Sequence, residues 1–438
     1  MAGAERRVGV RRWCVVLPVV MSVAATAGCS GRTAAPTDIQ KDMLGVAEAA
    51  LERRDFVAAA STYRSLAEAG IARAQLEYAR MLLDGQGVRA DEVEAAAWLQ
   101  RAADGGEVTA MRELGRLYVD GVGVETDTGR AASLFAAAAE RGDETARYEL
   151  ARMSLDSGHG DPALAVAAMT RAAMAGHIDA QLDLAAMHVR GRYLPKDPGE
   201  ARRWYRIAST ALAAEAERGD GSAKMKLAAL QLAGKGVPQN TERAVAAYRE
   251  LAQRGRVSAM VALARLYKRG APGLPADRER AIFYFEQAVE RGHVGATYDL
   301  AKLFYAGGGP RADRTRAARL FARALERGEP RSLTYLGEIY SDDWEGRDYA
   351  KAADFHARAA LRGEGKSAFR LAEMNERGRI ENADAALALA LYRRAAAAGY
   401  ARGAERAKRL EAELGRAEKD RAAALEQEWI ARATALRL

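Results

Sequence analysis

Five histidines are the residues best suited to acid–base or metal chemistry in this 438-residue sequence, because imidazole titrates near neutrality and binds transition metals. None of them belongs to a His-Glu-x-x-His element, and the sequence holds no Cys-x-x-Cys or Gly-x-Ser-x-Gly element. Each falls on a variable or packing position of a recurring pattern, which favours packing over catalysis or metal binding. We therefore predict no catalytic residue, no metal and no cofactor. The histidines are His159, His177, His188, His293 and His356.

Paired glycines are a second candidate for chemistry, because glycine-rich loops can cradle phosphate groups. Gly-x-Gly occurs within Asp84–Val88, Asp120–Val124 and Ala233–Val237. These segments follow helical patterns rather than strands, and they lack the third glycine of a dinucleotide-binding loop. We interpret them as turns, in which a glycine just past a helix end adopts the left-handed conformation at low cost.

An arginine series at steps of three and four is the sharpest charged feature of the sequence. Its members would share one helix face, and nearby arginines at 311, 314 and 331 would enlarge the positive patch. A smaller cluster lies at 202–206. The patch is either a solvated outer face or a docking surface for an acidic protein or a polyanionic polymer such as a polysaccharide. The series consists of Arg316, Arg319, Arg323 and Arg327.

Trp344 follows two aspartates in a polar turn, Asp342-Asp343-Trp344. A tryptophan in such a turn is either an exposed anchor for a partner or a side chain tucked between helices. We treat it as a second partner-binding candidate.

The composition indicates which elements carry these residues. Hydrophobic residues make up 49% of the sequence and aromatic residues only 7%, and alternating strand patterns are almost absent. The fold class predicted is therefore all-α, with many small helix contacts. The formal net charge of +8 is spread along the chain, which does not favour nucleic acid as a partner.

Ten glycines recur along the chain, each closing one helical stretch before the next begins. The steps between them are 34 to 37 residues, with one exception of 43. A constant period of this length predicts a solenoid of about ten helix-turn-helix repeats. The extra seven residues lie in Arg206–Glu217 and predict a longer helix there. The glycines are Gly70, Gly106, Gly142, Gly176, Gly219, Gly255, Gly292, Gly328, Gly363 and Gly399.

Each repeat also shows the same packing pattern. The first helix carries small and large apolar residues on one face, such as Ala110, Leu114, Gly115 and Leu117. The second helix carries a bulky residue seven positions before its closing glycine, which we predict to be a core residue. These are Tyr63, Leu99, Phe135, Met169, Leu212, Tyr248, Phe285, Phe321, His356 and Tyr392.

The repeats resemble Sel1-like repeats, relatives of the tetratricopeptide repeat. The resemblance is carried by Leu114–Tyr118 with Asp120–Val124, and by Ala201 to Tyr205, and it covers roughly residues 40–400. It implies a right-handed superhelical solenoid that binds partners. We place the solenoid at 39–399.

Beyond Gly399 the pattern changes to a charged segment at 400–438. Leucines at 410, 414, 425 and 436, with Trp429, predict one long amphipathic helix. An array needs its last apolar face covered, so we interpret this helix as a cap, with a dedicated partner-binding helix as the alternative.

The N-terminus has the pattern of an export signal. Four arginines precede an apolar stretch at 13–25, which is too short to span a bilayer. Thr26-Ala27-Gly28-Cys29 resembles the lipobox of bacterial lipoproteins, although an aliphatic residue is usual where Thr26 stands. The resemblance implies a signal peptide at 1–28, lipidation of Cys29, a tether at 29–38 and, with Ser30 next, sorting to the periplasmic face of the outer membrane. The alternative is a plain secretory signal.

Short motifs near the N-terminus resemble the scaffold lipoproteins of bacterial alginate export. They are Ala49–Phe56, Tyr63–Ala67 and Ala69–Gln75, with a weaker echo at 340–344. This resemblance implies a scaffold for exopolysaccharide secretion whose partners are an outer-membrane export porin and periplasmic components. The alternative is a general Sel1-repeat adaptor of the envelope, serving signalling, stress response or host interaction. An enzyme would need a nucleophile or a carboxylate pair that the repeats do not supply.

Overall fold

The computed structural model describes residues 37–158, 161–307, 311–342 and 346–435. Apart from one isolated bridge between Ala271 and Leu274, the regular structure in these ranges is α-helical. The all-α prediction is therefore confirmed. No helix within the described ranges combines the length and apolarity needed to cross a bilayer. Cys29 with its lipobox, His159 and Trp344 lie outside the described residues.

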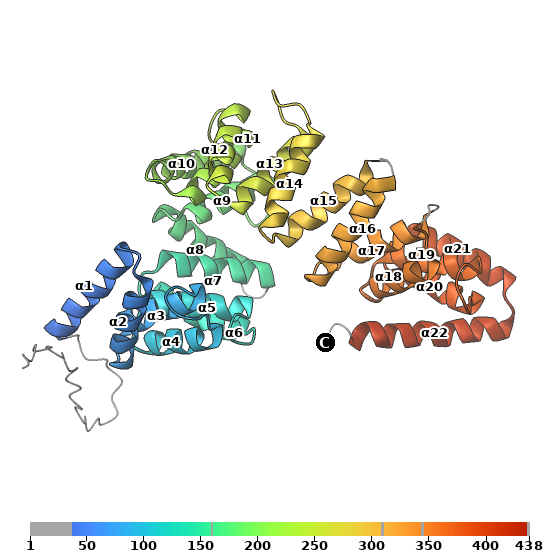
Figure 1. Cartoon of the computed structure of the whole chain (residues 1–438), viewed down its shortest axis with the longest axis horizontal. Coiled ribbons are helices and arrows are strands. Elements are labelled where there is room, and N and C mark those ends of the chain that lie inside the picture. Colours follow the sequence, from blue (N-terminus) through green and yellow to red (C-terminus); the bar gives the residue numbers. More distant parts are fainter. Residues whose placement is uncertain (1–36, 159–160, 308–310, 343–345, 436–438) are drawn as a thin grey trace, which may run out of the picture. The chain divides into compact units, whose positions relative to one another are not determined.

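The contacts divide the chain into two compact units, with the boundary after Ala180, and each unit is a stack of antiparallel helix pairs. The described helices that begin in the first unit run in chain order (Figure 1). They are α1 Asp38–Glu52, α2 Phe56–Glu68, α3 Ala72–Asp84, α4 Glu92–Asp104, α5 Val108–Asp120, α6 Thr128–Glu140, α7 Glu144–Ser157, α8 Pro162–Met174 and α9 Ile178–Arg190, within which the boundary falls.

The second unit continues with further pairs and ends in a long helix (Figure 1). Its helices are α10 Pro198–Glu217, α11 Gly221–Ala233, α12 Thr241–Gln253, α13 Val257–Arg269, α14 Arg278–Glu290, α15 Val294–Ala306, α16 Arg311–Glu326, α17 Ser332–Ser341, α18 Tyr349–Leu361, α19 Gly365–Glu376, α20 Ala385–Ala397, α21 Ala401–Glu413 and α22 Arg416–Ala435. The repeat solenoid predicted from the sequence is confirmed.

The bulky residues of the second helices form the core, as predicted. All ten are buried, and none exposes more than 4% of its surface. For Phe135 and His356, a glycine of a first helix allows the bulky side chain to approach closely. At Gly115, for example, a Cβ atom would lie only 2.8 Å from Cε1 of Phe135. These contacts are the close packing that makes a repeat stack on its neighbour.

Capping residues set the helix ends. The ten spaced glycines all have positive φ, between +83° and +98°. Around Gly70, the amide of Ile71 donates to the carbonyl of Leu66 at 3.1 Å, and that of Gly70 donates to Ala67 at 3.0 Å. These two hydrogen bonds satisfy carbonyl groups that the helix end leaves unpaired. An aspartate then caps most of the second helices, as Asp91 does for α4.

The Gly-x-Gly turns have a packing reason for their second glycine. Gly87 has φ +71°, and a Cβ atom there would lie 2.0 Å from the carbonyl oxygen of Phe56 at the start of α2. Gly123 has the same relation to Glu92 at the start of α4, again at 2.0 Å. Only a residue without a side chain allows this approach of two backbones. The turn interpretation therefore has a structural basis.

Two predictions concern the length of helices, one at α10 and one in the segment beyond Gly399. The extra seven residues do lengthen one helix, because α10 has 20 residues where most others have 13. The long helix predicted beyond Gly399 is present as α22, but it does not span the whole segment, because a shorter helix, α21, precedes it. The break falls at Leu414, which is extended with ψ 147°, and at Gly415. Glycine is a poor helix former, and the break lets α22 turn back and pack on α20 and α18 (Figure 1).

Candidate functional site

The predicted arginine series lies on α16, to one side of the face that buries Ala317, Phe321 and Ala324. Two of its members are engaged by neighbouring helices. Arg316 forms an ion pair with Glu286 and lies 4.4 Å from the ring centroid of Phe304. Arg327 donates to the carbonyl of Gly292 at 3.3 Å. These two arginines hold α16 against α14 and α15.

Arg319 and Arg323, the other two members, are exposed, and neither pairs with another described residue. Their exposure is compatible with both interpretations of the series, a solvated outer face and a docking surface. Two residues before Trp344, the Oδ2 atom of Asp342 lies 3.7 Å from the Nη1 atom of Arg314. Burial raises the pKa of Asp342 above its usual value.

The described histidines take structural positions. His293 caps α15, where its Nδ1 atom accepts the amide of Ala296 at 2.9 Å, and His177 does the same at the start of α9. His188 lies 3.1 Å from the carbonyl of Pro195, and His356 is a fully buried core residue. Among the described residues, no group of three His, Cys, Asp or Glu side chains could hold a metal ion.

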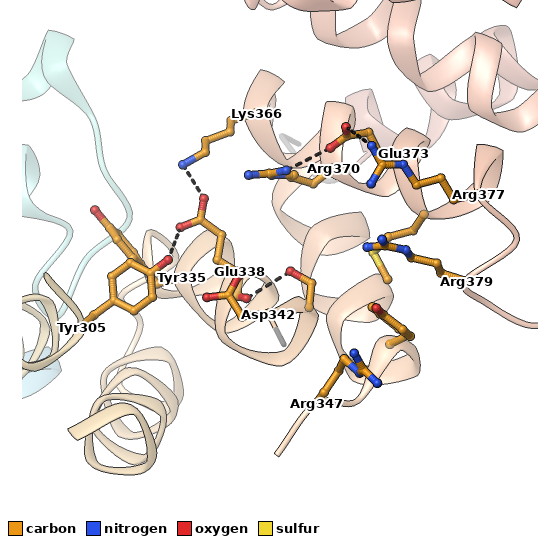
Figure 2. Close-up of a pocket in the computed structure, with 13 residues that line it drawn as sticks. Tyr305, Tyr335, Glu338, Asp342, Arg347, Lys366, Arg370, Glu373, Arg377 and Arg379 are labelled. Carbon is orange, nitrogen blue, oxygen red and sulfur yellow. Dashed lines mark hydrogen bonds and ion pairs between the residues drawn. The ribbon is translucent and has the colours of Figure 1, made fainter. Parts of the chain in front are cut away.

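A cavity of about 550 Å³ in the second unit is the best candidate site, and we call it the α17–α19 groove (Figure 2). It lies over the first helices of three successive repeats, α15, α17 and α19, and reaches the start of α18. Five of its lining side chains are cationic and three are carboxylates. The lining residues are Tyr305, Tyr335, Glu338, Ser341, Asp342, Arg347, Tyr349, Lys366, Arg370, Glu373, Met374, Arg377 and Arg379.

One end of the groove is organised around Glu338 (Figure 2). Its carboxylate accepts the hydroxyl of Tyr305 at 3.1 Å and forms an ion pair with Lys366. Burial, with Glu338 as a second cause, raises the pKa of Tyr305, so this hydroxyl remains a donor at neutral pH. These contacts tie α15, α17 and α19 together.

Glu373 lies between Arg370 of its own helix and Arg377, the C-cap residue of that helix. Arg370 donates to it at 3.0 Å, and Arg377 pairs with its other oxygen at 3.4 Å. A single carboxylate therefore faces two guanidinium groups (Figure 2). Only 16% of the Glu373 side chain is exposed, so both arginines are held in place.

The other end of the groove is built on Tyr349. The guanidinium groups of Arg347 and Arg379 lie over its ring, at 5.3 and 5.4 Å from the centroid. Such cation–π contacts orient guanidinium groups. The groove holds five cations and three carboxylates, and burial disfavours the charged form of one carboxylate, Asp342. The groove is therefore electropositive.

Sequence reasoning missed this groove, although a signal was present in the charges of the first helices. In several repeats an arginine pairs with an acidic residue of the next repeat. Arg116 contacts Glu149 at 3.0 Å, and Arg265 contacts Asp299 at 2.7 Å. Each such pair spans the boundary between two repeats and neutralises both charges.

In α17 and α19 the charges at these two positions are exchanged. Glu338 stands where Arg116 and Arg265 stand in their repeats, and Arg370 stands where Glu149 stands. Arg377 likewise replaces the aspartate found at the corresponding place in α17, Asp342. Arg370 pairs within its own helix instead of across the boundary. A comparison of charges by repeat position would have marked these residues as exceptional.

The sequence pattern of the Sel1 repeat matches eight stretches, which together make up more than half of the chain. They are residues 72–107, 108–143, 178–211, 221–255, 257–293, 294–329, 330–364 and 365–400. No curated protein matches the sequence.

The solved structures that are similar to the chain include the following two. One is a protective antigen of uropathogenic Escherichia coli with an SLR fold, at 24% identity and a TM-score of 0.47, over 90% of this chain and 84% of that one. The other is a Sel1 repeat protein from Oxalobacter formigenes, at 25% identity and a TM-score of 0.43, over 56% of this chain and 96% of that one.

Proposed function

The chain belongs to the Sel1 repeat family, and from that premise we propose that it is a non-catalytic scaffold that holds protein partners together. The observation that carries the proposal is the α17–α19 groove, where side chains from three successive repeats converge. Stacked helices fix these side chains, and a preorganised surface loses less entropy when a partner binds. Sel1 repeats suggest protein partners, and the groove is where we expect one to dock.

Crosslinking in intact cells tests the scaffold proposal. A photo-reactive amino acid at Ser341, a partly exposed residue that lines the groove, should give a crosslinked protein partner that mass spectrometry identifies. The same amino acid at Val93, an exposed position of α4, is the matched control and should not yield that partner. A chain that crosslinks to no protein from either position, at native expression, would contradict the scaffold proposal.

We also propose that the chain is a lipoprotein anchored through Cys29 on the periplasmic face of the outer membrane. The support is the sequence at 1–30, where a basic and apolar export signal leads to the lipobox-like Thr26–Cys29. Labelling with a palmitate analogue should mark the wild type and not Cys29→Ala. Cys14→Ala, which leaves the lipobox unchanged, is the control. An unlabelled wild type would remove the anchor.

The pathway we propose is assembly of an exopolysaccharide secretion complex of the alginate type, with an export porin and periplasmic components as partners. Its support is the resemblance of residues 49–75 to scaffold lipoproteins of alginate export. Deletion of the gene should abolish polymer secretion while other envelope functions persist. Unchanged secretion would leave the general envelope adaptor as the better assignment.

A further inference from the structure

We infer that the α17–α19 groove binds an acidic peptide segment of a protein partner, with Arg370, Arg377 and Arg379 holding its carboxylates. The inference rests on the proposed scaffold function and names the chemistry that the scaffold recognises.

The guanidinium groups of the groove leave hydrogen-bond donors unused. Arg370 and Arg377 share one carboxylate, Glu373, and each uses few of its N–H donors there. Arg379 makes its described contact with the ring of Tyr349 rather than with an acid. Guanidinium groups bind planar carboxylates through paired, charge-assisted hydrogen bonds. Further carboxylates are therefore the groups that would complete this site.

The charged residues of α19 and of its C-cap form a row. Lys366, Arg370, Glu373 and Arg377 follow at steps of four, three and four, which places them on one helix face. The row extends over about 16 Å at the rise of an α-helix. An extended peptide covers that length with about five residues. A short acidic segment therefore matches the row in both charge and length.

The aromatic rings of the groove favour a peptide over an acidic polysaccharide. Sugar rings stack on uncovered aromatic faces, but the groove covers two of its rings with its own side chains. Tyr335 stacks on Phe321 at 4.8 Å and also lies beneath Lys302, while Tyr349 carries two guanidinium groups. The groove thus offers hydrogen-bond donors for carboxylates more than platforms for sugars.

The test uses the full-length protein and a fluorescein-labelled peptide of alternating aspartate and glycine, with binding followed by fluorescence anisotropy. The wild type should bind it, and added salt should weaken binding. The double variant Arg377→Glu/Arg379→Glu should weaken it by about tenfold or more, the loss expected for charge-assisted hydrogen bonds. A peptide of alternating asparagine and glycine should not bind.

The matched control is Arg319→Glu/Arg323→Glu, which makes the same change of charge on the exposed face of α16. It should bind the acidic peptide like the wild type. Equal loss in both double variants would show that overall charge, not the groove, binds the peptide, and would overturn the inference. Circular dichroism checks folding, and Arg379→Gln alone, at an exposed position, repeats the test should the double variant unfold.

An alginate oligomer is the competing probe. Groove-dependent binding of the oligomer without binding of the acidic peptide would overturn the inference in favour of a polymer ligand. The crosslinking experiment above decides the scaffold function separately. A partner that crosslinks to Ser341 equally well in the wild type and in Arg377→Glu/Arg379→Glu would leave the scaffold standing and reject the acidic segment.

Discussion

His356 shows how one residue can fill a structural place and still change the protein's chemistry. It occupies the position of the bulky core residues and is fully buried, with both ring nitrogens lacking a hydrogen-bond partner among the described residues. Burial lowers its pKa to about 4, against a raising influence from Glu338 and lowering ones from Arg370 and Lys366. The buried imidazole is therefore neutral at physiological pH, and its unpaired nitrogens cost stability.

We predict that His356 makes stability depend on pH. In the unfolded chain it takes up a proton below about pH 6.5, whereas the folded chain does so only near pH 4. The unfolded state therefore binds more protons in this window, so the free energy of unfolding falls by roughly 3 kcal/mol as pH drops from 6.5 to 4. Urea unfolding at several pH values measures this dependence.

His356→Phe is the variant that isolates this effect. Phenylalanine already fits against a glycine at the same place in another repeat, as Phe135 does against Gly115. We expect the variant to be more stable at neutral pH by about 1 kcal/mol, and to lose the part of the pH dependence described above. An unchanged slope between pH 4 and 6.5 would assign that dependence to other groups.

Gly123 gives a second prediction at the scale of one residue. Gly123→Ala requires a side chain at φ +67° and 2.0 Å from a backbone oxygen, so it should lower the free energy of unfolding by more than about 3 kcal/mol. Gly106→Ala is the control, because Gly106 also has positive φ but open space around its Cβ position, and should cost about 1 kcal/mol. If denaturant unfolding shows equal losses of stability in the two variants, the positive φ alone, and not the close backbone contact, explains why glycine is needed at position 123.

At the scale of elements, the C-terminal segment shows how packing favours two separate helices over one continuous helix. α21 continues the stack on α20 and buries Ala407 and Leu410, while its other faces are charged. α22 instead lies along α20, with Leu425 and Trp429 against the core there. An ion pair at 2.6 Å joins Arg421 to Asp384 at the start of α20. The cap is thus shared by two helices.

We predict that α22 can be released without unfolding the repeats. Leu425→Asp places a charge against the apolar surface of α20 and should weaken docking by about 2 kcal/mol. Limited proteolysis should then cut near Gly415 and leave the preceding helices protected. The control is Glu428→Asp, at an exposed position of the same helix. Cleavage that spreads into α20 would show that the repeats need α22 to fold.

At the scale of the whole molecule, most described helices pack mainly on their neighbours in sequence, in both units, and α22, which packs on α20, is an exception. Stability in such an array is close to a sum of local contributions and is lowest where a helix has a neighbour on one side only. α1 illustrates this, because Ala47 and Ala50 are its only described residues that are buried. The ends and the interior should therefore differ in stability.

Hydrogen exchange measures this difference. We expect amides of α1 and α22 to exchange faster than those of α5 and α14, whose helices are packed on both sides within their own units. Mass spectrometry of peptic fragments resolves these elements in the full chain. Uniform protection along the chain would indicate a single cooperative block instead of a nearest-neighbour array.

The sequence by itself determined the repeat, because periodic glycines and core positions are local signals that recur some thirty-six residues apart. Gly70 and its nine counterparts have positive φ because the chain must reverse there, and Tyr63 and Tyr392 are buried because each lies on the apolar face of its helix. The long α10 followed from its seven additional residues for the same reason.

Only the tertiary structure decided which charges meet. The arginines of α16 form a clear series in sequence, yet packing engages Arg316 and Arg327 and leaves Arg319 and Arg323 apart from the groove. Glu338 and Lys366 come together because α17 and α19 are first helices of successive repeats, which lie side by side in the stack. Contacts between repeats depend on how helix faces align in space. That alignment cannot be deduced from the spacing of residues along one helix.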